Sequence, residues 1–230
     1  IKNGGGDGVG FDHVRQVGGV AEELLDPDLA DEEVFESEQS IVELRTAPVI
    51  LEIEATRSET VTNLVSHADR GRLWSRHVAD SLQLVALAPN GARSWIDLGA
   101  GGGFPGLVVA IARRETDMTL VESNRKKAAF LIRAAAECGL RVKVETGRAE
   151  TLPESPYDVV SARALAPLHK LFNLSVRFFG GETIGLFPKG RDAATEIDMA
   201  RQQYQFDLET RPSLTDPDGA ILVVTNLVRV

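Results

Sequence analysis

The feature that most limits the fold of this chain is the stretch SWIDLGAGGGFPGLVVAI at residues 94–111. Five residues of strand character lead into a loop with glycine at positions 99, 101, 102 and 103, and an apolar, helix-like run follows. Glycine adopts backbone conformations closed to other residues, so this loop permits a sharp reversal between a buried strand and a helix packed on it. The stretch therefore predicts a strand–loop–helix unit, the building block of α/β folds, with a ligand-binding loop at its turn.

The rest of the chain repeats this unit. From residue 93 onward short apolar segments alternate with amphipathic ones, which favours a mostly parallel, doubly wound sheet with helices on both faces. We predict strands at 94–98, 117–122, 141–146, 157–162, 183–187, 205–211 and 220–228, and helices at 105–114, 124–138, 166–178 and 191–203. Only PSLTDPDG separates the last two strands, which is too short for a crossover helix, so we expect an antiparallel hairpin there.

The N-terminal part differs in composition from this α/β body. Residues 1–39 are rich in glycine and acidic residues and thinly apolar, which indicates an acidic, flexible leader. Residues 40–90 have helical periodicity and predict a small helical cap in front of the main domain, which we place at 91–230.

Charge and cysteine content limit the classes of function that this chain can have. The whole chain has a net charge of −9, but residues 1–60 hold 15 acidic and 4 basic residues, and residues 61–230 hold 19 and 21, a net +2. A body close to neutrality is compatible with a basic face that contacts RNA. The single cysteine, Cys138, excludes an internal disulfide and a cysteine-based zinc site, so we expect no metal and a reducing, cytoplasmic environment. We find neither a membrane-spanning apolar run nor a signal-peptide pattern.

An acidic residue before the glycines bears on the ligand of the loop. Gly101, Gly103 and Gly106 match the G-x-G-x-x-G spacing of dinucleotide-binding loops, but glycine-rich segments match it easily by chance. Asp97 ends the first strand, where a carboxylate disfavours a pyrophosphate and favours a cationic ligand. S-adenosylmethionine carries a sulfonium and an ammonium group and no phosphate. We therefore predict that Asp97, with Gly99, Gly101 and Gly103, binds this cofactor.

Three further segments extend the predicted cofactor site. Glu122 ends the second strand, where a carboxylate accepts hydrogen bonds from ribose hydroxyls in both NAD-binding and S-adenosylmethionine-binding enzymes. Ala149 and Glu150 follow the third strand and are placed at the adenine edge of the same pocket. Arg163 ends the fourth strand, where a guanidinium is suited to a cofactor carboxylate, a phosphate or the O6 edge of guanine.

Basic residues at the same ends of the strands predict an RNA-binding edge. Arg125, Arg148, Lys189 and Arg191 each follow a predicted strand, and in a parallel sheet these positions share one edge. Lysine and arginine there are suited to RNA phosphates. Lys189 and Arg163 are also the candidates for orienting an acceptor base.

Six segments, taken in order, resemble one family. WSRHVADSLQL, IDLGAGGGFPGLVVAI, VESNRKKAAFL, GRAE, SARALAPL and LFPKG are similar to motifs of the RsmG (GidB) family, bacterial enzymes that methylate N7 of a guanine in 16S ribosomal RNA. The resemblance covers about residues 61–230. It implies a Rossmann-like methyltransferase sheet, with S-adenosylmethionine bound by Gly99, Phe104, Ala149, Glu150 and Arg163, and with Glu122 near the ribose.

The resemblance also implies a mechanism and a partner. Guanine N7 has an in-plane lone pair and no proton, so its attack on a sulfonium methyl group needs no general base but does need alignment and desolvation. His77, which with Arg76, Asp80 and Ser81 matches the helical motif of the family, is therefore expected to pack or to form hydrogen bonds. The implied partner is 16S ribosomal RNA or the small ribosomal subunit, and we expect a monomer that does not engage a membrane.

Two other functions remain compatible with the residues. An NAD-dependent oxidoreductase fits the glycine spacing and Glu122, although the predicted edge lacks a Ser-Tyr-Lys-like or cysteine nucleophile set. A non-catalytic module that binds S-adenosylmethionine would keep the loop without forming a pocket for a base.

Overall fold

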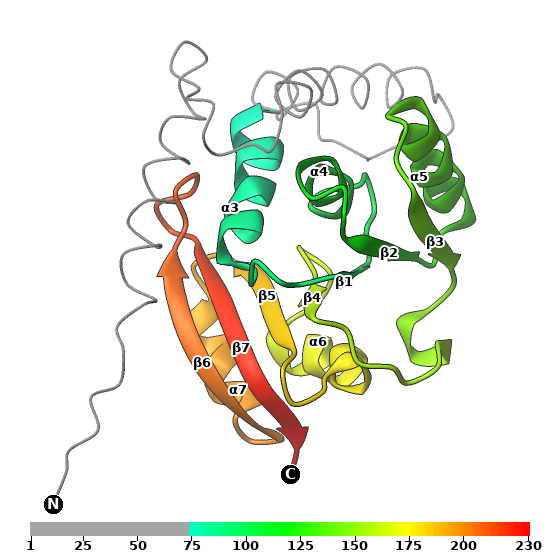
Figure 1. The fold of residues 1–230 in the computed structure, drawn as a ribbon. Helices are drawn as coiled ribbons and strands as arrows, with labels where there is room; N and C mark the ends of the chain where they lie inside the picture. Colours follow the sequence, from blue (N-terminus) through cyan, green and yellow to red (C-terminus); the bar gives the residue numbers. More distant parts are fainter. Residues whose placement is uncertain (1–73) are drawn as a thin grey trace, which may run out of the picture.

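The computed structural model of the chain describes residues 74–230 (Figure 1). The predicted leader at 1–39 and most of the predicted cap at 40–90 lie outside the described residues. Within the cap, a π-helical segment at Trp74–Ala79 continues directly into helix α3 at Asp80–Leu87. This part of the chain is therefore helical, as its periodicity predicts, whereas the proposed domain boundaries stay predictions.

A seven-stranded sheet forms the centre of the structure. Its order is β3-β2-β1-β4-β5-β7-β6; the first five strands are parallel, and β7 is antiparallel to both β5 and β6. The strands are β1 (Ser94–Leu98), β2 (Asp117–Glu122), β3 (Val142–Thr146), β4 (Val159–Ser161), β5 (Ile184–Lys189), β6 (Tyr204–Pro212) and β7 (Ala220–Arg229). The doubly wound sheet with a C-terminal antiparallel hairpin is confirmed.

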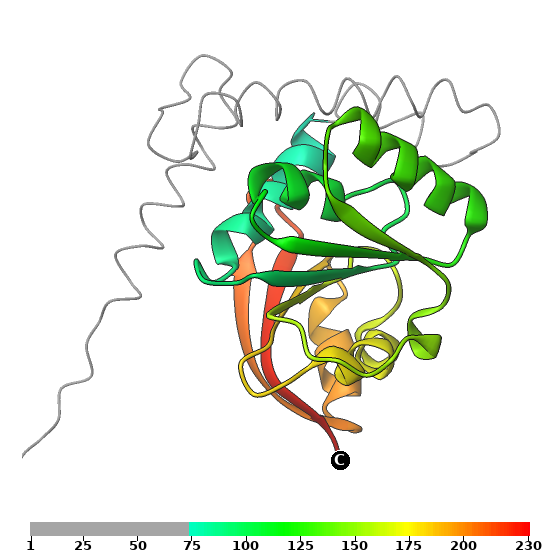
Figure 2. The ribbon, with the colours of Figure 1, turned by 45° about the vertical axis from the view of Figure 1, so that its right-hand side comes forward.

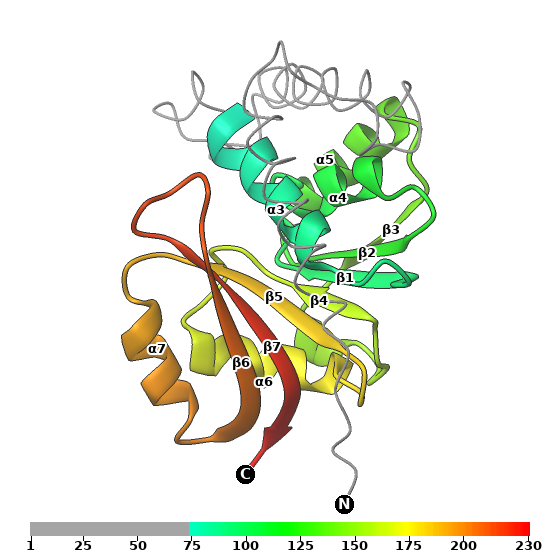
Figure 3. The same cartoon turned by 60° about the vertical axis from the view of Figure 1, so that its left-hand side comes forward.

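Helices cover both faces of this sheet (Figures 2 and 3). On one face lie α3, α4 (Gly106–Ala112) and α5 (Arg125–Glu137), and on the other lie α6 (Leu168–Ser175) and α7 (Ala193–Ala200). Trp95 and Ile96, neighbours on β1, belong to different apolar clusters, because successive side chains of a strand point to opposite faces. Burial on both faces explains why the central strands are mostly apolar and do not alternate between apolar and polar residues.

The elements differ from the predicted ranges at their ends. The helix predicted at 166–178 begins only at Leu168, after Pro167, and finishes as the 3-10 helix η5 (Val176–Phe178). Strand β4 is shorter than the predicted 157–162. Before it, the carboxylate of Asp158 accepts hydrogen bonds from the amides of Arg93 (2.7 Å) and Ser94 (2.9 Å), so side-chain bonds replace the ladder toward β1 there.

The carboxyl ends of the five parallel strands lie along one edge of the sheet, which is where ligands bind in doubly wound folds. The site residues predicted above lie near the last positions of these strands, in the loops that follow β1 to β5, or in the first residues of the helices after those loops. Along residues 74–230, no helix has the length and apolar character needed to cross a membrane.

Candidate active site

The glycine loop (residues 99–105) turns sharply at the end of β1. Gly99, Gly101 and Gly103 have φ values of 70°, 53° and 90°, in the left-handed region that favours glycine. The amides of Gly99 and Ala100 donate to the carbonyl of Val121 in β2 at 2.9 and 3.0 Å. The loop is therefore fixed to the neighbouring strand and presents backbone atoms at the carboxyl end of β1 and β2.

Asp97 lies beneath this loop. The residue is 1% exposed, and its carboxylate accepts hydrogen bonds from Ser161 Oγ (2.7 Å) and from the amide of Gly106 (3.2 Å). Ser161 Oγ also accepts a hydrogen bond from Nε1 of Trp95 (2.9 Å). The carboxylate that we expected to face a cationic ligand thus joins β1 to β4 and to the first turn of α4, and it supports the loop from below.

The burial of Asp97 predicts a pH dependence of stability. Burial raises the pKa of Asp97 from 3.8 to about 7, and its hydrogen bonds oppose this shift. Since the pKa is higher in the folded state, the contribution of Asp97 to folding is complete below pH 3.8 and is lost as the pH rises through about 7. This loss is at most roughly 4 kcal/mol. We expect urea titrations of Asp97→Asn to lack the decline in the free energy of unfolding between these pH values.

The control for this prediction is Asp117→Asn, an exposed acid at the start of β2. It should reproduce the pH profile of the wild type. If the free energy of unfolding of Asp97→Asn declines with pH as steeply as that of the wild type, Asp97 is not the source of the pH dependence.

Glu122 ends β2 beside the glycine loop. The residue is 7% exposed; Oε2 accepts a hydrogen bond from the amide of Gly101 (3.0 Å) and Oε1 from the amide of Asn124 (2.7 Å). Asn124 itself caps α5, because its side chain accepts hydrogen bonds from the amides of the first turn. Each carboxylate oxygen has two lone pairs, so Glu122 is held firmly and still has acceptor capacity for a ligand.

The predicted Ala149–Glu150 pair opens the 3-10 helix η4 (Ala149–Thr151) after β3. Ala149 is buried and Glu150 is exposed. Arg177 donates to the backbone carbonyls of Ala149 (3.3 Å), Glu150 and Leu152 (3.2 Å). One guanidinium thus fixes this turn at the same edge of the sheet as the glycine loop.

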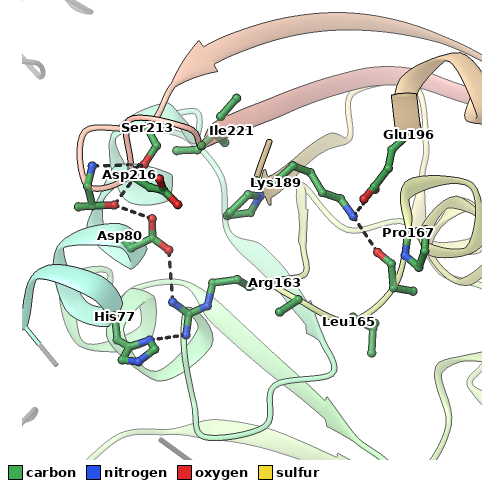
Figure 4. A pocket seen from close by; sticks show the side chains of 17 residues that line it. His77, Asp80, Arg163, Leu165, Pro167, Lys189, Glu196, Ser213, Asp216 and Ile221 are labelled. Carbon is green, nitrogen blue, oxygen red and sulfur yellow. Dashed lines mark hydrogen bonds and ion pairs between the residues drawn. The ribbon is translucent and has the colours of Figure 1, made fainter. Parts of the chain in front are cut away.

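Arg163, which follows β4, connects the helical cap to the glycine loop. Figure 4 shows its contacts with His77 and Asp80 of the cap. Its guanidinium donates to Nδ1 of His77 (2.8 Å) and pairs with Oδ2 of Asp80 (3.3 Å), and its Cζ lies 5.7 Å from the ring centroid of Phe104. His77 stacks on the same ring, with centroids 5.1 Å apart. Because arginine has only donors, Nδ1 of His77 is an acceptor here. His77 packs and forms a hydrogen bond, as expected from the sequence.

A pocket of about 720 Å³ opens beside Arg163 (Figure 4). Two segments form much of its wall: residues 163–167, which we call the β4–α6 segment, and residues 213–219, which we call the β6–β7 loop. Asp80 holds the two together, because one oxygen pairs with Arg163 and the other accepts a hydrogen bond from Thr215 Oγ1 (2.9 Å). The volume lies within the range of about 300–1,000 Å³ that is typical of small-molecule sites.

Lys189 lines this pocket, but other groups hold its ammonium. Nζ donates to the carbonyl of Ala166 (2.7 Å) and pairs with Oε2 of Glu196 (2.8 Å), and the side chain is 10% exposed. Two of its three N–H donors are therefore engaged. Lys189 links β5 and α7 to the β4–α6 segment.

The other basic residues predicted at this edge are exposed. Arg125 opens α5 after β2, Arg148 precedes η4 after β3, and Arg191 follows β5. Arg191 pairs with Asp218 of the β6–β7 loop at 3.3 Å. The structure thus brings the three guanidinium groups to the carboxyl ends of the strands, with more solvent access than Lys189 has.

Four residues that sequence reasoning missed hold the site together: Ser161, Glu196, Gln83 and Thr215. Gln83 is 5% exposed, accepts a hydrogen bond from the amide of Leu214 (2.7 Å) and donates to Thr215 Oγ1 (3.2 Å). It therefore anchors the β6–β7 loop to α3. Only Ser161 carried a local signal, because it is the second-last residue of the predicted fourth strand, two positions before Arg163.

Known proteins resemble most of this chain. Residues 54–218 match the model of the GidB family, described as rRNA small subunit methyltransferase G. Ribosomal RNA small subunit methyltransferase G of Parvibaculum lavamentivorans is 45% identical over 208 residues, which cover 87% of this chain and 92% of the relative. The protein of the same name from Methylorubrum populi is 47% identical over 182 residues, with 77% and 86% covered.

Solved structures support the fold. The crystal structure of M. jannaschii TYW2 in complex with AdoMet has a TM-score of 0.52 at 14% sequence identity, over 67% of this chain and 76% of that chain. The similarity therefore extends to the arrangement of the sheet and its helices.

Proposed function

This chain belongs to the ribosomal RNA small subunit methyltransferase G family, and from this premise we propose that it transfers the methyl group of S-adenosylmethionine to N7 of a guanine in 16S ribosomal RNA. The observation that carries the proposal is the meeting of the glycine loop, Glu122 and Arg163 at one edge of the sheet, beside a pocket with room for a nucleotide. The oxidoreductase and the non-catalytic module considered above do not fit a methyltransferase family.

The residues at the glycine loop fit S-adenosylmethionine. A Cβ at Gly101 would have only the carbonyl oxygen of Gly99 within 4 Å, at 3.6 Å, so the backbone here is open to close approach by a ligand. Glu122 retains acceptor capacity for the ribose hydroxyls. The bound cofactor supplies an electrophilic methyl group on sulfur. The residues assigned to it are Gly99, Gly101, Gly103, Phe104, Glu122, Ala149, Glu150 and Arg163, with Asp97 as the support beneath the loop.

The acceptor base is assigned to the pocket between the β4–α6 segment and the β6–β7 loop. This pocket adjoins the glycine loop, because a Cβ at Gly99 would lie only 2.6 Å from Cδ1 of Leu165 in its wall. Guanine N7 carries a lone pair and no proton, so it would accept the methyl group as the bond to sulfur breaks, the neutral thioether would leave, and no general base would be needed. The protein would contribute alignment and exclusion of water. Arg163 orients the base through O6, and Lys189 assists with its remaining N–H.

The RNA backbone is assigned to the basic residues of the same edge, which are Arg125, Arg148, Lys189 and Arg191. Phosphate contacts fix the register of a nucleic acid, and exposed guanidinium groups around a pocket are suited to that role. The partner is 16S ribosomal RNA, naked or within the small subunit. We propose that a monomer acts on it in the cytoplasm.

Methylation of ribosomal RNA from a strain that lacks the gene tests this function. The purified protein, labelled S-adenosylmethionine and either naked 16S RNA or small subunits are incubated, and the RNA is digested and analysed by mass spectrometry. We expect 7-methylguanosine at one position. RNA from the parent strain, which is already modified, is the control and should take up little label. If no guanine is modified in either substrate, the proposed function is wrong.

A further inference from the structure

The β4–α6 segment lies between the glycine loop, which is assigned to the cofactor, and the pocket assigned to the acceptor base. On one side, Leu165 packs so closely over Gly99 that a Cβ there would clash with it at 2.6 Å. On the other side, the residues of the segment line the pocket assigned to the acceptor base. Ala164 has a φ of 53°, which is uncommon for a residue other than glycine, so surrounding contacts must hold the segment in this conformation. Its position therefore governs how donor and acceptor meet.

One carboxylate holds the far end of this segment. Oε2 of Glu196, in the first turn of α7, pairs with Nζ of Lys189 at 2.8 Å, and the same ammonium donates to the carbonyl of Ala166 at 2.7 Å. Oε2 also accepts a hydrogen bond from the amide of Leu168 at 2.7 Å. Figure 4 shows Glu196, Lys189 and the end of the segment converging at one place. The segment is thus held through the carbonyl of Ala166 and, directly after its last residue, through the amide of Leu168.

The local sequence offers no substitute for this contact. Helix α6 has Pro167 at its N-cap position, and no side chain of the cap accepts a hydrogen bond from the first turn. Glu196 supplies from another helix the acceptor that a serine or aspartate cap would supply locally. The Lys189 and Glu196 side chains are only 10% and 22% exposed, and charged hydrogen bonds shielded from water are stronger than exposed ones.

We propose that Glu196 is a positioning residue for methyl transfer, acting through Lys189 and Leu168 to hold the β4–α6 segment where the acceptor base meets the methyl donor. This inference rests on the proposed function. Glu196 lies in the wall of the same pocket, but its carboxylate is engaged by Lys189 and by the amide of Leu168, and it acts through these two residues. Its loss is therefore expected to lower the rate of the chemical step more than the affinity for the cofactor.

Three variants of the full chain test the proposal: Glu196→Gln, the double variant Lys189→Met with Glu196→Gln, and the control Glu154→Gln, which removes an exposed partner of Arg177. Single-turnover methyl transfer is measured at saturating cofactor and RNA, together with the dissociation constant for S-adenosylmethionine and the midpoint of thermal unfolding. Glu196→Gln should slow transfer by about 10- to 100-fold, the size expected for misplacement of reacting groups. Its cofactor affinity should stay within threefold of the wild-type value, and Glu154→Gln should match the wild type throughout.

The double variant separates positioning from stability. Glu196→Gln leaves a nearly buried ammonium without its carboxylate, whereas the double variant removes both charges, so its thermal midpoint should recover toward that of the wild type. Its transfer rate should stay low, because Ala166 then lacks its donor as well as Leu168 its charged acceptor. Recovery of both quantities, or wild-type transfer by Glu196→Gln, would overturn the proposal.

Amide hydrogen exchange gives a readout that does not depend on activity. We expect faster exchange at the amide of Leu168 in Glu196→Gln than in the wild type or in Glu154→Gln, because this amide loses a charged acceptor. Unchanged exchange would overturn the proposal whether or not methylation is observed. If the wild-type protein leaves guanine unmodified although exchange responds as expected, the proposed function fails and the anchoring of the segment stands.

Discussion

Replacing Arg163 by alanine should slow methyl transfer by about 100- to 1,000-fold at saturating S-adenosylmethionine and RNA, which is the range measured when a preorganised donor is removed from an active site. The guanidinium lies at the meeting point of the cap, the glycine loop and the pocket: it pairs with Asp80, donates to His77 and lies over Phe104. The substitution removes both the proposed donor to the base and a link that holds the pocket wall. Single-turnover kinetics with labelled cofactor measure the effect.

Two comparisons show whether the loss comes from the geometry of the guanidinium. Arg163→Lys keeps the positive charge but not the planar fork that reaches two acceptors at once. Its transfer rate should therefore be at least tenfold below that of the wild type, and at the lowest about equal to that of the alanine variant. Arg114→Ala removes an exposed arginine between α4 and β2, at the opposite edge of the sheet, and should react like the wild type. Wild-type transfer by Arg163→Ala at saturating cofactor would refute the assigned role.

The sheet was predictable because its signal is local. Strands buried on both faces are mostly apolar along their length, and the glycines and prolines between them mark the turns, so β1 and β2 lie at the predicted positions. Positions that end parallel strands must share one edge, which is why the glycine loop, Glu122 and Arg163 could be grouped without a structure. Strand β4 was predicted too long because Asp158 uses its side chain to bond backbone amides at the start of β1.

The direction of the site side chains was less predictable, because it depends on partners distant in the sequence. Asp97 ends β1 as expected, but Ser161 and the amide of Gly106 draw its carboxylate under the loop. Lys189 reaches the pocket as expected, but Glu196 and Ala166 engage its ammonium. In each case the residue type and its strand position are local properties, whereas the hydrogen-bond partner follows from which strands and helices become neighbours in the fold.

Replacing Gly99 by alanine should weaken S-adenosylmethionine binding by about 10- to 100-fold. At a φ of 70° an added Cβ introduces backbone strain of roughly 1–2 kcal/mol. It would also lie 2.6 Å from Cδ1 of Leu165, so the β4–α6 segment or the glycine loop must move. Each tenfold loss of affinity corresponds to about 1.4 kcal/mol. Strain of this size in the cofactor-bound loop is therefore enough for the tenfold end of the predicted range. Isothermal titration calorimetry with the cofactor measures the change.

Gly139→Ala separates this local effect from backbone strain in general. Gly139 has a φ of 62° after the end of α5, and a Cβ there would meet no atom within 4 Å. Both variants should therefore lose a similar amount of stability from backbone strain, with a further loss for Gly99→Ala from the contact with Leu165. Only Gly99→Ala should lose cofactor affinity. Equal cofactor affinity in the two variants would mean that the cofactor does not lie against the loop at Gly99. Glu122 and η4 would then bind the cofactor without a contact at Gly99.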